Sequence, residues 1–143
     1  MVDGASKGNP GKAGGGGIIF SLEGNIILSF AYGLGLLSNN QAEYLALWQG
    51  LLQARSLGIL NLVVIGDSRI VIQSLARKSR LNQLSLAQHY ARIQSRVAEF
   101  DRIHFFHILR GLNHQADREA NVGTTLSKGE IKINGRTSYI PIP

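Results

Sequence analysis

A short run of apolar residues, Leu62-Val63-Val64-Ile65, places the strongest constraint on how this 143-residue chain can fold. The run is rich in β-branched side chains, and residues with helical periodicity lie on either side of it. A strand that is apolar on both faces and lies between helices is typical of a parallel sheet covered by helices. The sequence therefore predicts an α/β fold, and its length fits one domain.

Turn residues and apolar periodicity predict the remaining elements. The end of a strand that runs into a turn is expected at 1–6, and further strands at 18–20, 26–32, 62–65 and 103–109. Helices are expected at 40–57, 68–78, 85–99 and 114–126. Their order, βββ-α-β-α-α-β-α, predicts a five-stranded mixed sheet flanked by helices. The glycine run 14–17 is expected to let a neighbouring element approach closely. Residues 1–127 are expected to form the domain, and residues 128–143 a linker or a peripheral extension.

The composition narrows the range of partners. The chain has 15 Lys and Arg against 9 Asp and Glu, a net charge of +6, which favours a polyanionic partner such as nucleic acid. A merely basic, soluble surface explains the same composition equally well. The absence of cysteine excludes disulfides and thiolate metal sites, and it favours an intracellular location. No apolar run approaches the roughly 20 residues that cross a bilayer, and no secretory leader is visible, so no membrane partner is expected.

Four acidic residues stand out by their position in the predicted elements. Asp3 is expected at the end of the first strand, Asp67 follows the buried strand, and Asp117 lies in the first turn of the last helix. Glu43 is the only charged side chain between Asn40 and Ala54, in a nearly apolar helix. Carboxylates that converge on one site repel one another unless divalent cations neutralise them, and oxygen ligands suit Mg²⁺ or Mn²⁺. Two such ions form the clamp used in phosphodiester cleavage.

Each acid also has an ordinary alternative role. Asp3 could open an Asp-Gly turn, Asp67 could cap the following helix, and Asp117 could complement the helix dipole. Glu43 could lie on a solvated helix edge with two glutamines, although helical angles place it about a quarter-turn from them. Spacing alone leaves these alternatives open.

Four motifs carry a resemblance to a known family. Residues 3–11, Asp-Gly-Ala-Ser-Lys-Gly-Asn-Pro-Gly, resemble the opening motif of type 1 ribonuclease H. Residues 39–43 resemble its Asn-Asn-x-x-Glu motif, and residues 66–68 are similar to its Asp-Ser motif after a buried strand. Residues 113–117 resemble its Asn-x-x-Ala-Asp motif. The four occur in family order over about residues 1–127, and they look closest to domains found in plant proteins and in reverse transcriptases.

The resemblance implies an activity and its cofactors. It implies a ribonuclease H that cuts the RNA strand of RNA–DNA hybrids and leaves 5′-phosphate and 3′-hydroxyl ends. Two Mg²⁺ ions, with Mn²⁺ as a possible substitute, would be held by Asp3, Glu43, Asp67 and Asp117 as catalytic carboxylates. The expected partner is the hybrid duplex, and the isolated domain is expected to be monomeric.

Substrate contacts are also implied by the resemblance. Such contacts lie along the minor groove, where 2′-hydroxyls distinguish RNA from DNA. The residues concerned are Ser6, Gly8, Asn9, Asn39, Asn40, Arg69 and Asn113. Arg69 stands where many relatives have an amide, and it could hold a phosphate instead.

The chain departs from the family pattern in two regions. The loop before Asp117 is short and lacks the usual histidine; His114 could substitute, although a histidine in a first helical turn is more often polar surface. His104 and His107 are expected on opposite faces of a strand, which argues against a shared metal site. The basic region 77–84 predicts at most a reduced grip on the hybrid, with modest and salt-dependent affinity.

Two other functions fit the same residues. The chain could be a weakly active or inactive module that binds hybrids or RNA within a larger, retroelement-type protein. It could also be a DNA nuclease of integrase-like or resolvase-like fold, although the first two motifs speak against that substrate.

Overall fold

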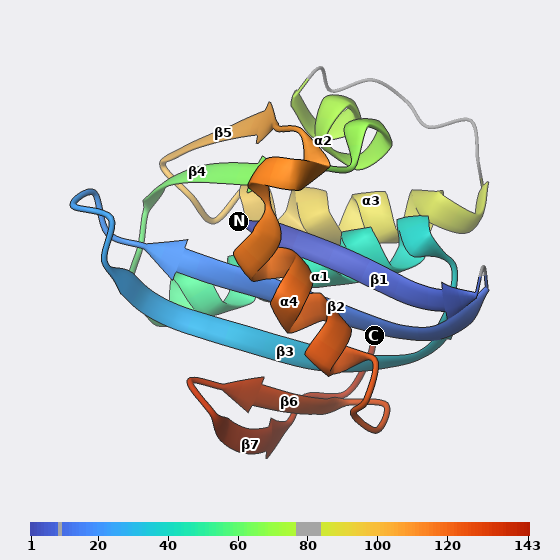
Figure 1. Ribbon diagram of the computed structural model, residues 1–143. Coiled ribbons are helices and arrows are strands. Elements are labelled where there is room, and N and C mark those ends of the chain that lie inside the picture. The colour runs from blue at the N-terminus through green and yellow to red at the C-terminus, as the bar shows by residue number, and fades with distance from the viewer. Residues whose placement is uncertain (9, 77–83) are drawn as a thin grey trace.

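The computed structural model describes residues 1–8, 10–76 and 84–143, which form a mixed sheet with helices on both faces (Figure 1). The strand order is β5-β4-β1-β2-β3-β6-β7. The strands are β1 Val2–Gly8, β2 Gly11–Phe20, β3 Ile26–Leu37, β4 Asn61–Gly66, β5 Arg102–His107, β6 Glu130–Ile133 and β7 Arg136–Tyr139. The helices are α1 Asn39–Ser56, α2 Arg69–Ala76, α3 Leu84–Val97 and α4 His114–Gly123, with a short 3₁₀ turn at Arg110–Leu112. The expected α/β class and element order are confirmed.

The central strand β1 determines where the site forms. It pairs antiparallel with β2 along its whole length, and it pairs in parallel with β4 through Val2 and Gly66. This register brings Asp3, the residue after Val2, next to Asp67, the residue after Gly66. The expectation that Asp3 ends its strand is wrong, because β1 continues to Gly8. Asp3 therefore lies inside the sheet rather than in a turn.

Glycines in β2 allow helices to pack closely on both faces of the sheet. A Cβ atom at Gly16 would lie 2.3 Å from the Ala120 nitrogen of α4, and one at Gly14 would lie 2.4 Å from the Ala120 carbonyl oxygen. One at Gly15 would lie 3.0 Å from the Cβ of Ala46 in α1. Because side chains alternate along a strand, the same glycine run serves α4 on one face and α1 on the other. The close approach expected from the sequence is confirmed, and α4 crosses the sheet over β1, β2 and β3 (Figure 1).

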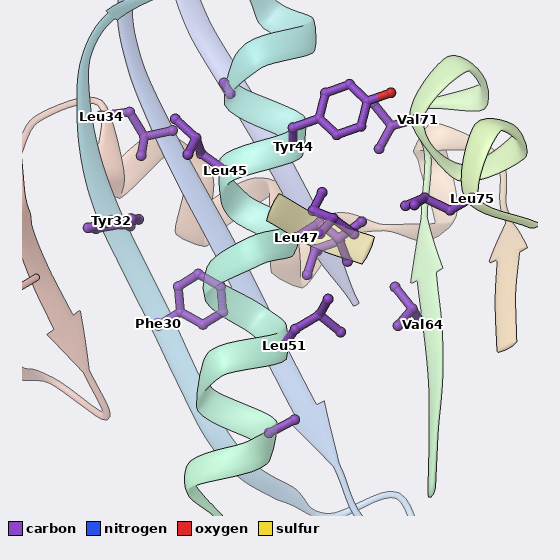
Figure 2. Close-up of a cluster of buried hydrophobic side chains, with 14 of the residues drawn as sticks. Phe30, Tyr32, Leu34, Tyr44, Leu45, Leu47, Leu51, Val64, Val71 and Leu75 are labelled. Carbon is purple, nitrogen blue, oxygen red and sulfur yellow. The ribbon is translucent and has the colours of Figure 1, made fainter. Parts of the chain in front are cut away.

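The hydrophobic core lies between α1 and the sheet. Figure 2 shows buried α1 side chains, including Tyr44, Leu47 and Leu51, packed towards β3, β4 and α2. Burying a side chain of this size stabilises the fold by roughly 1.5–3 kcal/mol. The helix begins with a capping box, in which Ser38 and Gln41 satisfy each other's backbone N–H groups. The core and the cap together fix the position of the first turns of α1.

The sheet has seven strands, so the expectation of five is too low. Residues 128–143 supply β6 and β7, and Ile131 of β6 pairs with Tyr32 of β3. The Tyr32 hydroxyl donates a hydrogen bond of 2.7 Å to the Ile140 carbonyl. The C-terminal segment therefore adds two strands to the edge of the sheet. None of the helices in the described residues is long and apolar enough to cross a membrane.

Candidate active site

Three of the four predicted carboxylates meet at one point. Asp3 of β1, Glu43 of α1 and Asp67 after β4 each offer an oxygen, and these oxygens lie within 4.8 Å of one another. The three residues are 24 or more positions apart in the chain, so only the fold brings them together. All three are well buried: Asp3 is 3% exposed, Glu43 6%, and the side chain of Asp67 1%.

Gly4 makes the approach of Glu43 possible. A Cβ atom at Gly4 would lie 2.4 Å from the backbone nitrogen of Glu43, so any side chain there would push α1 away. Instead, the Gly4 N–H donates a hydrogen bond of 2.9 Å to Glu43 Oε1. The possible solvated edge shared by Glu43, Gln49 and Gln53 is wrong, because all three are buried.

Crowding of the carboxyl groups changes their proton affinity. Burial raises the pKa of Asp3, and the neighbouring carboxyls of Glu43 and Asp67 raise it further. Burial also raises the pKa of Glu43, although hydrogen bonds from Asp3 and the Gly4 N–H partly offset this. A carboxyl with a raised pKa binds a proton at pH values at which it would ordinarily be charged. The cluster therefore favours an added positive charge, whether a proton or a cation.

Asp67 has the least satisfied carboxylate of the cluster. Both of its side-chain oxygens are buried and have no hydrogen-bond partner among the residues that the structure describes. The guanidinium Nε of Arg110 lies 3.9 Å from Asp67 Oδ2, and the Arg110 side chain is 86% exposed. Buried carboxylate oxygens without donors are costly unless a cation meets them. The donor set and its unmet oxygens fit a hard divalent metal ion.

Asp117 lies at the rim of the cluster. It sits in the first turn of α4, is half-buried, and is outside the group of three oxygens within 4.8 Å. A hydrogen bond between the side chains of Asp117 and Asp3 adds to the raised pKa of Asp3. The start of α4 is attached to β1 because Asn113 Nδ2 donates a hydrogen bond of 2.9 Å to the Val2 carbonyl.

A pocket of about 240 Å³ opens beside the cluster. Its polar walls come from β1, α1, the turn before α4, and α4 itself. The lining side chains include Asp3, Ser6, Lys7, Asn39, Arg110, Asp117 and Asn121. Arg110 and Lys7 give this acidic pocket a cationic rim, which suits a polyanion that must approach carboxylates.

The remaining predicted residues lie at different depths. Gly8 and Asn39 are exposed, and Asn39 lines the pocket. Asn40 is half-buried in the first turn of α1. The Ser6 hydroxyl lies within hydrogen-bond distance of the Gly8 and Leu37 carbonyls. Asn9 and residues 77–83 of the basic region 77–84 lie outside the described residues.

The last predicted residues, Asn113, Arg69 and the histidines, range from fully buried to exposed. Asn113 is fully buried, so its contact is with β1. Arg69 and His114 are exposed at the first residues of α2 and α4. His104 is exposed and His107 half-buried, on opposite faces of β5, and His107 Nε2 lies 3.2 Å from the Asp67 carbonyl.

Sequence reasoning missed Arg110. It belongs to a short 3₁₀ turn, in which no periodicity singles out one side chain. Its position three residues before the Asn113–Asp117 motif was the available signal, since a cation next to a carboxylate motif is a candidate partner.

Comparison with known proteins identifies the family. The chain superimposes on the crystal structure of ribonuclease H1 from Halobacterium salinarum with a TM-score of 0.83 and 34% identity, covering 87% of this chain and 94% of that one. A family model described as reverse transcriptase-like matches residues 1–123. The chain belongs to the type 1 ribonuclease H family. The family expected from the four motifs and the expected enzyme class are thus confirmed.

Other ribonuclease H relatives have the same fold. The N-terminal ribonuclease H domain of a Mycobacterium tuberculosis protein gives a TM-score of 0.83 at 31% identity, covering 87% of this chain and 90% of that one. A bifunctional protein of Mycobacterium tuberculosis is 33% identical over 121 residues, which are 84% of this chain and 33% of that protein. Ribonuclease HI of Halobacterium salinarum is 35% identical over 119 residues, or 83% of this chain and 60% of that protein. The chain thus spans about a third of the bifunctional protein and three-fifths of ribonuclease HI.

Proposed function

We propose that this chain is a metal-dependent endonuclease that cuts the RNA strand of RNA–DNA hybrids. One observation carries the proposal: three buried carboxylates from three separate elements converge within 4.8 Å, and both oxygens of Asp67 lack a hydrogen-bond donor in the described part of the chain. A structural role does not require such an arrangement, because it leaves like charges together at a cost to stability. A site that binds cations does require it.

Two divalent ions would be held by Asp3, Glu43, Asp67 and Asp117. Oxygen-only ligands favour Mg²⁺, with Mn²⁺ as a substitute. When bound, the ions supply the charge that activates water and stabilises the leaving 3′ oxygen, which gives 5′-phosphate and 3′-hydroxyl ends. Because Asp117 lies at the rim, it would complete the shell on the side of the pocket.

The residues of the chain supply binding and orientation. Arg110 and Lys7 at the rim would hold phosphates of the backbone, and their exposure leaves them accessible to a duplex. Ser6 and Asn39, which line the pocket, would read 2′-hydroxyls together with Gly8 and Asn40. Asn9 is proposed for the same role from its place in the first motif. The choice of a hybrid is supported by a related ribonuclease H1, isolated from compost, whose structure in complex with an RNA/DNA hybrid is 28% identical to this chain with a TM-score of 0.81.

Two exposed side chains have secondary roles in this proposal. Arg69, at the start of α2 after Asp67, would contact a phosphate. His114, at the start of α4, would assist proton transfer or product release at the edge of the site, and His114→Ala would then lower turnover without changing metal affinity.

A cleavage assay with end-labelled substrates tests the proposal. The wild-type chain with Mg²⁺ should cut the RNA strand of a hybrid, and leave duplex DNA and duplex RNA largely intact. Asp67→Asn should abolish cleavage, whereas the exposed acid Glu23→Gln, in the turn between β2 and β3, serves as the matched control. Full activity of Asp67→Asn would overturn the proposal. Tight binding of the hybrid without cleavage, even in Mn²⁺, would show a binding module instead.

A further inference from the structure

Asp117 differs from the other three carboxylates in how it is held. Asp3, Glu43 and Asp67 are fixed by burial and by one another, whereas Asp117 is half-buried on the first turn of α4. A side chain at that position is free to change rotamer unless a neighbour holds it. A carboxylate that must complete a site needs such a neighbour, because small displacements of a ligand weaken binding and catalysis.

Asn121 provides the contact. It lies one helical turn after Asp117 and therefore on the same face of α4. Its Nδ2 donates to the Asp117 backbone carbonyl at 2.9 Å and to Asp117 Oδ2 at 3.3 Å. Asn121 therefore contacts both the main chain and the carboxylate of Asp117.

Lys7 determines which way the Asn121 amide faces. The Lys7 ammonium donates a hydrogen bond of 2.9 Å to Asn121 Oδ1. A lysine has only donors, so it accepts one orientation of the amide, with Oδ1 towards Lys7 and Nδ2 towards Asp117. If the amide turned over, an amino group would face the ammonium and a carbonyl oxygen would face the carboxylate.

The bridge links the two elements that carry Asp3 and Asp117. Lys7 lies on β1, four residues after Asp3, and Asn121 lies on α4, four residues after Asp117. At the other end of the same helix, Asn113 is bonded to Val2, one residue before Asp3. Two asparagine contacts thus attach α4 to β1 on both sides of the acids, as the course of α4 over β1 in Figure 1 allows.

We infer that Asn121 is a positioning residue for Asp117, and that Lys7 holds Asn121 in the orientation that donates to the carboxylate. The inference rests on the proposed function, since it assigns Asp117 to that site. It gives Lys7 a second task besides contact with phosphates: the same side chain fixes the amide that fixes the acid. Such supporting residues typically contribute about 10-fold to 100-fold in metal affinity or activity.

Four variants distinguish the positioning of Asp117 from a purely electrostatic effect of the Lys7 charge. Asn121→Ala removes the bridge, Lys7→Met removes its donor but keeps the length of the side chain, and Lys7→Arg keeps a donor-only cation. Lys12→Met is the matched control, because Lys12 is exposed and lies directly opposite Lys7 in the register of β1 and β2. It removes the same charge from the same face without touching Asn121.

Two measurements on the full chain apply to each variant: kcat and KM for hybrid cleavage, and Mn²⁺ affinity by calorimetry without substrate. Asn121→Ala and Lys7→Met should each lower kcat or Mn²⁺ affinity by about 10-fold. Lys7→Arg should restore most of the loss, and Lys12→Met should leave both quantities unchanged. Melting temperatures should stay close to that of the wild type, because the bridge is largely exposed.

Clear outcomes would overturn the inference. If Asn121→Ala leaves both kcat and Mn²⁺ affinity unchanged, Asn121 does not position Asp117. If Lys7→Met changes only KM, as a lost phosphate contact would, Lys7 does not hold the amide. If the wild-type chain cuts no hybrid, the proposed function fails, and the Mn²⁺ affinities of the same variants still decide whether the bridge supports Asp117.

Discussion

The crowded carboxyl groups should make the metal-free protein less stable than a variant with one fewer carboxyl group. We expect Asp3→Asn to raise stability in EDTA at pH 7, although it removes a residue of the proposed site. Burial and the carboxyls of Glu43 and Asp67 raise the pKa of Asp3 above neutrality. The folded protein must therefore bind a proton that the unfolded chain does not bind at this pH.

The size of the effect follows from the proton affinity. A carboxyl with an ordinary pKa of 3.8 that stays protonated in the folded protein at pH 7 costs roughly 4 kcal/mol, since each tenfold change in proton affinity is worth about 1.4 kcal/mol. An asparagine needs no proton, and its amide can donate to Glu43. Part of this cost falls on Glu43, whose pKa is also raised by burial. We therefore expect Asp3→Asn to increase the free energy of unfolding by roughly 1–3 kcal/mol, or Tm by several degrees.

The pH dependence has a definite sign. A carboxyl whose pKa is raised on folding makes the folded state bind more protons, so stability falls as pH rises from the ordinary pKa towards the raised one. The stability of the metal-free wild type should therefore decrease from about pH 4 through neutrality, and Asp3→Asn should show a weaker slope. Urea unfolding followed by circular dichroism at pH 5, 7 and 8.5 measures both.

Mg²⁺ should reverse the order of the two proteins. An ion that binds only the folded protein stabilises it, by roughly 3 kcal/mol at a concentration 100 times Kd, and Asp3→Asn should gain much less. Glu23→Gln, which alters an exposed acid, should follow the wild type throughout. The reasoning is refuted if Asp3→Asn in EDTA at pH 7 is no more stable than the wild type and keeps the same pH slope.

Three further substitutions probe the packing, the rim and the C-terminal segment. Gly16→Ala should destabilise the protein by about 3 kcal/mol, because its Cβ would lie 2.3 Å from the backbone of α4; Gly111→Ala, with open space around it, should change little in the same urea unfolding experiment. Arg110→Ala should weaken hybrid binding in EDTA and reduce the slope of log K against log salt by about one, and an unchanged slope would rule out a phosphate contact. Tyr32→Phe should cost about 1 kcal/mol by losing its 2.7 Å hydrogen bond to the C-terminal segment, whereas Tyr139→Phe, an exposed tyrosine, should be nearly neutral in thermal unfolding.

Elements with strong periodicity or clear ends could be predicted from the sequence. The expected helix at 40–57 corresponds to α1 at Asn39–Ser56, and the apolar run 62–65 corresponds to β4 at Asn61–Gly66. The strands β6 and β7 could not be found in this way, because they have four residues each and mixed polarity. The strand β6 is stabilised by pairing with β3, about a hundred residues earlier, and β7 by pairing with β6. No local pattern records the pairing of β6 with β3.

The candidate site was predictable in its residues but not in its geometry. Motif order singled out the four acids, yet spacing could not show that three of them form one buried group while Asp117 lies at its rim. The depth of Asn113 was also hidden, because an asparagine before a helix usually caps it at the surface. Here the fold uses that amide inside the protein, on the Val2 carbonyl.

The contact between the glycines of β2 and the backbone of α4 has a consequence for motion. In most cores, side chains separate a helix from a sheet, and their rotamer changes let the two layers shift slightly against each other. At Gly14 and Gly16 no side chain intervenes, so the main chains of β2 and α4 meet directly. Thermal displacement of α4 towards the sheet is blocked by the backbone itself. We expect the last turns of α4, where Ala120 and Gly123 meet these glycines, to show order parameters as high as those of β2, so that heating loosens the side chain of Asp117 before it loosens the helix that carries it.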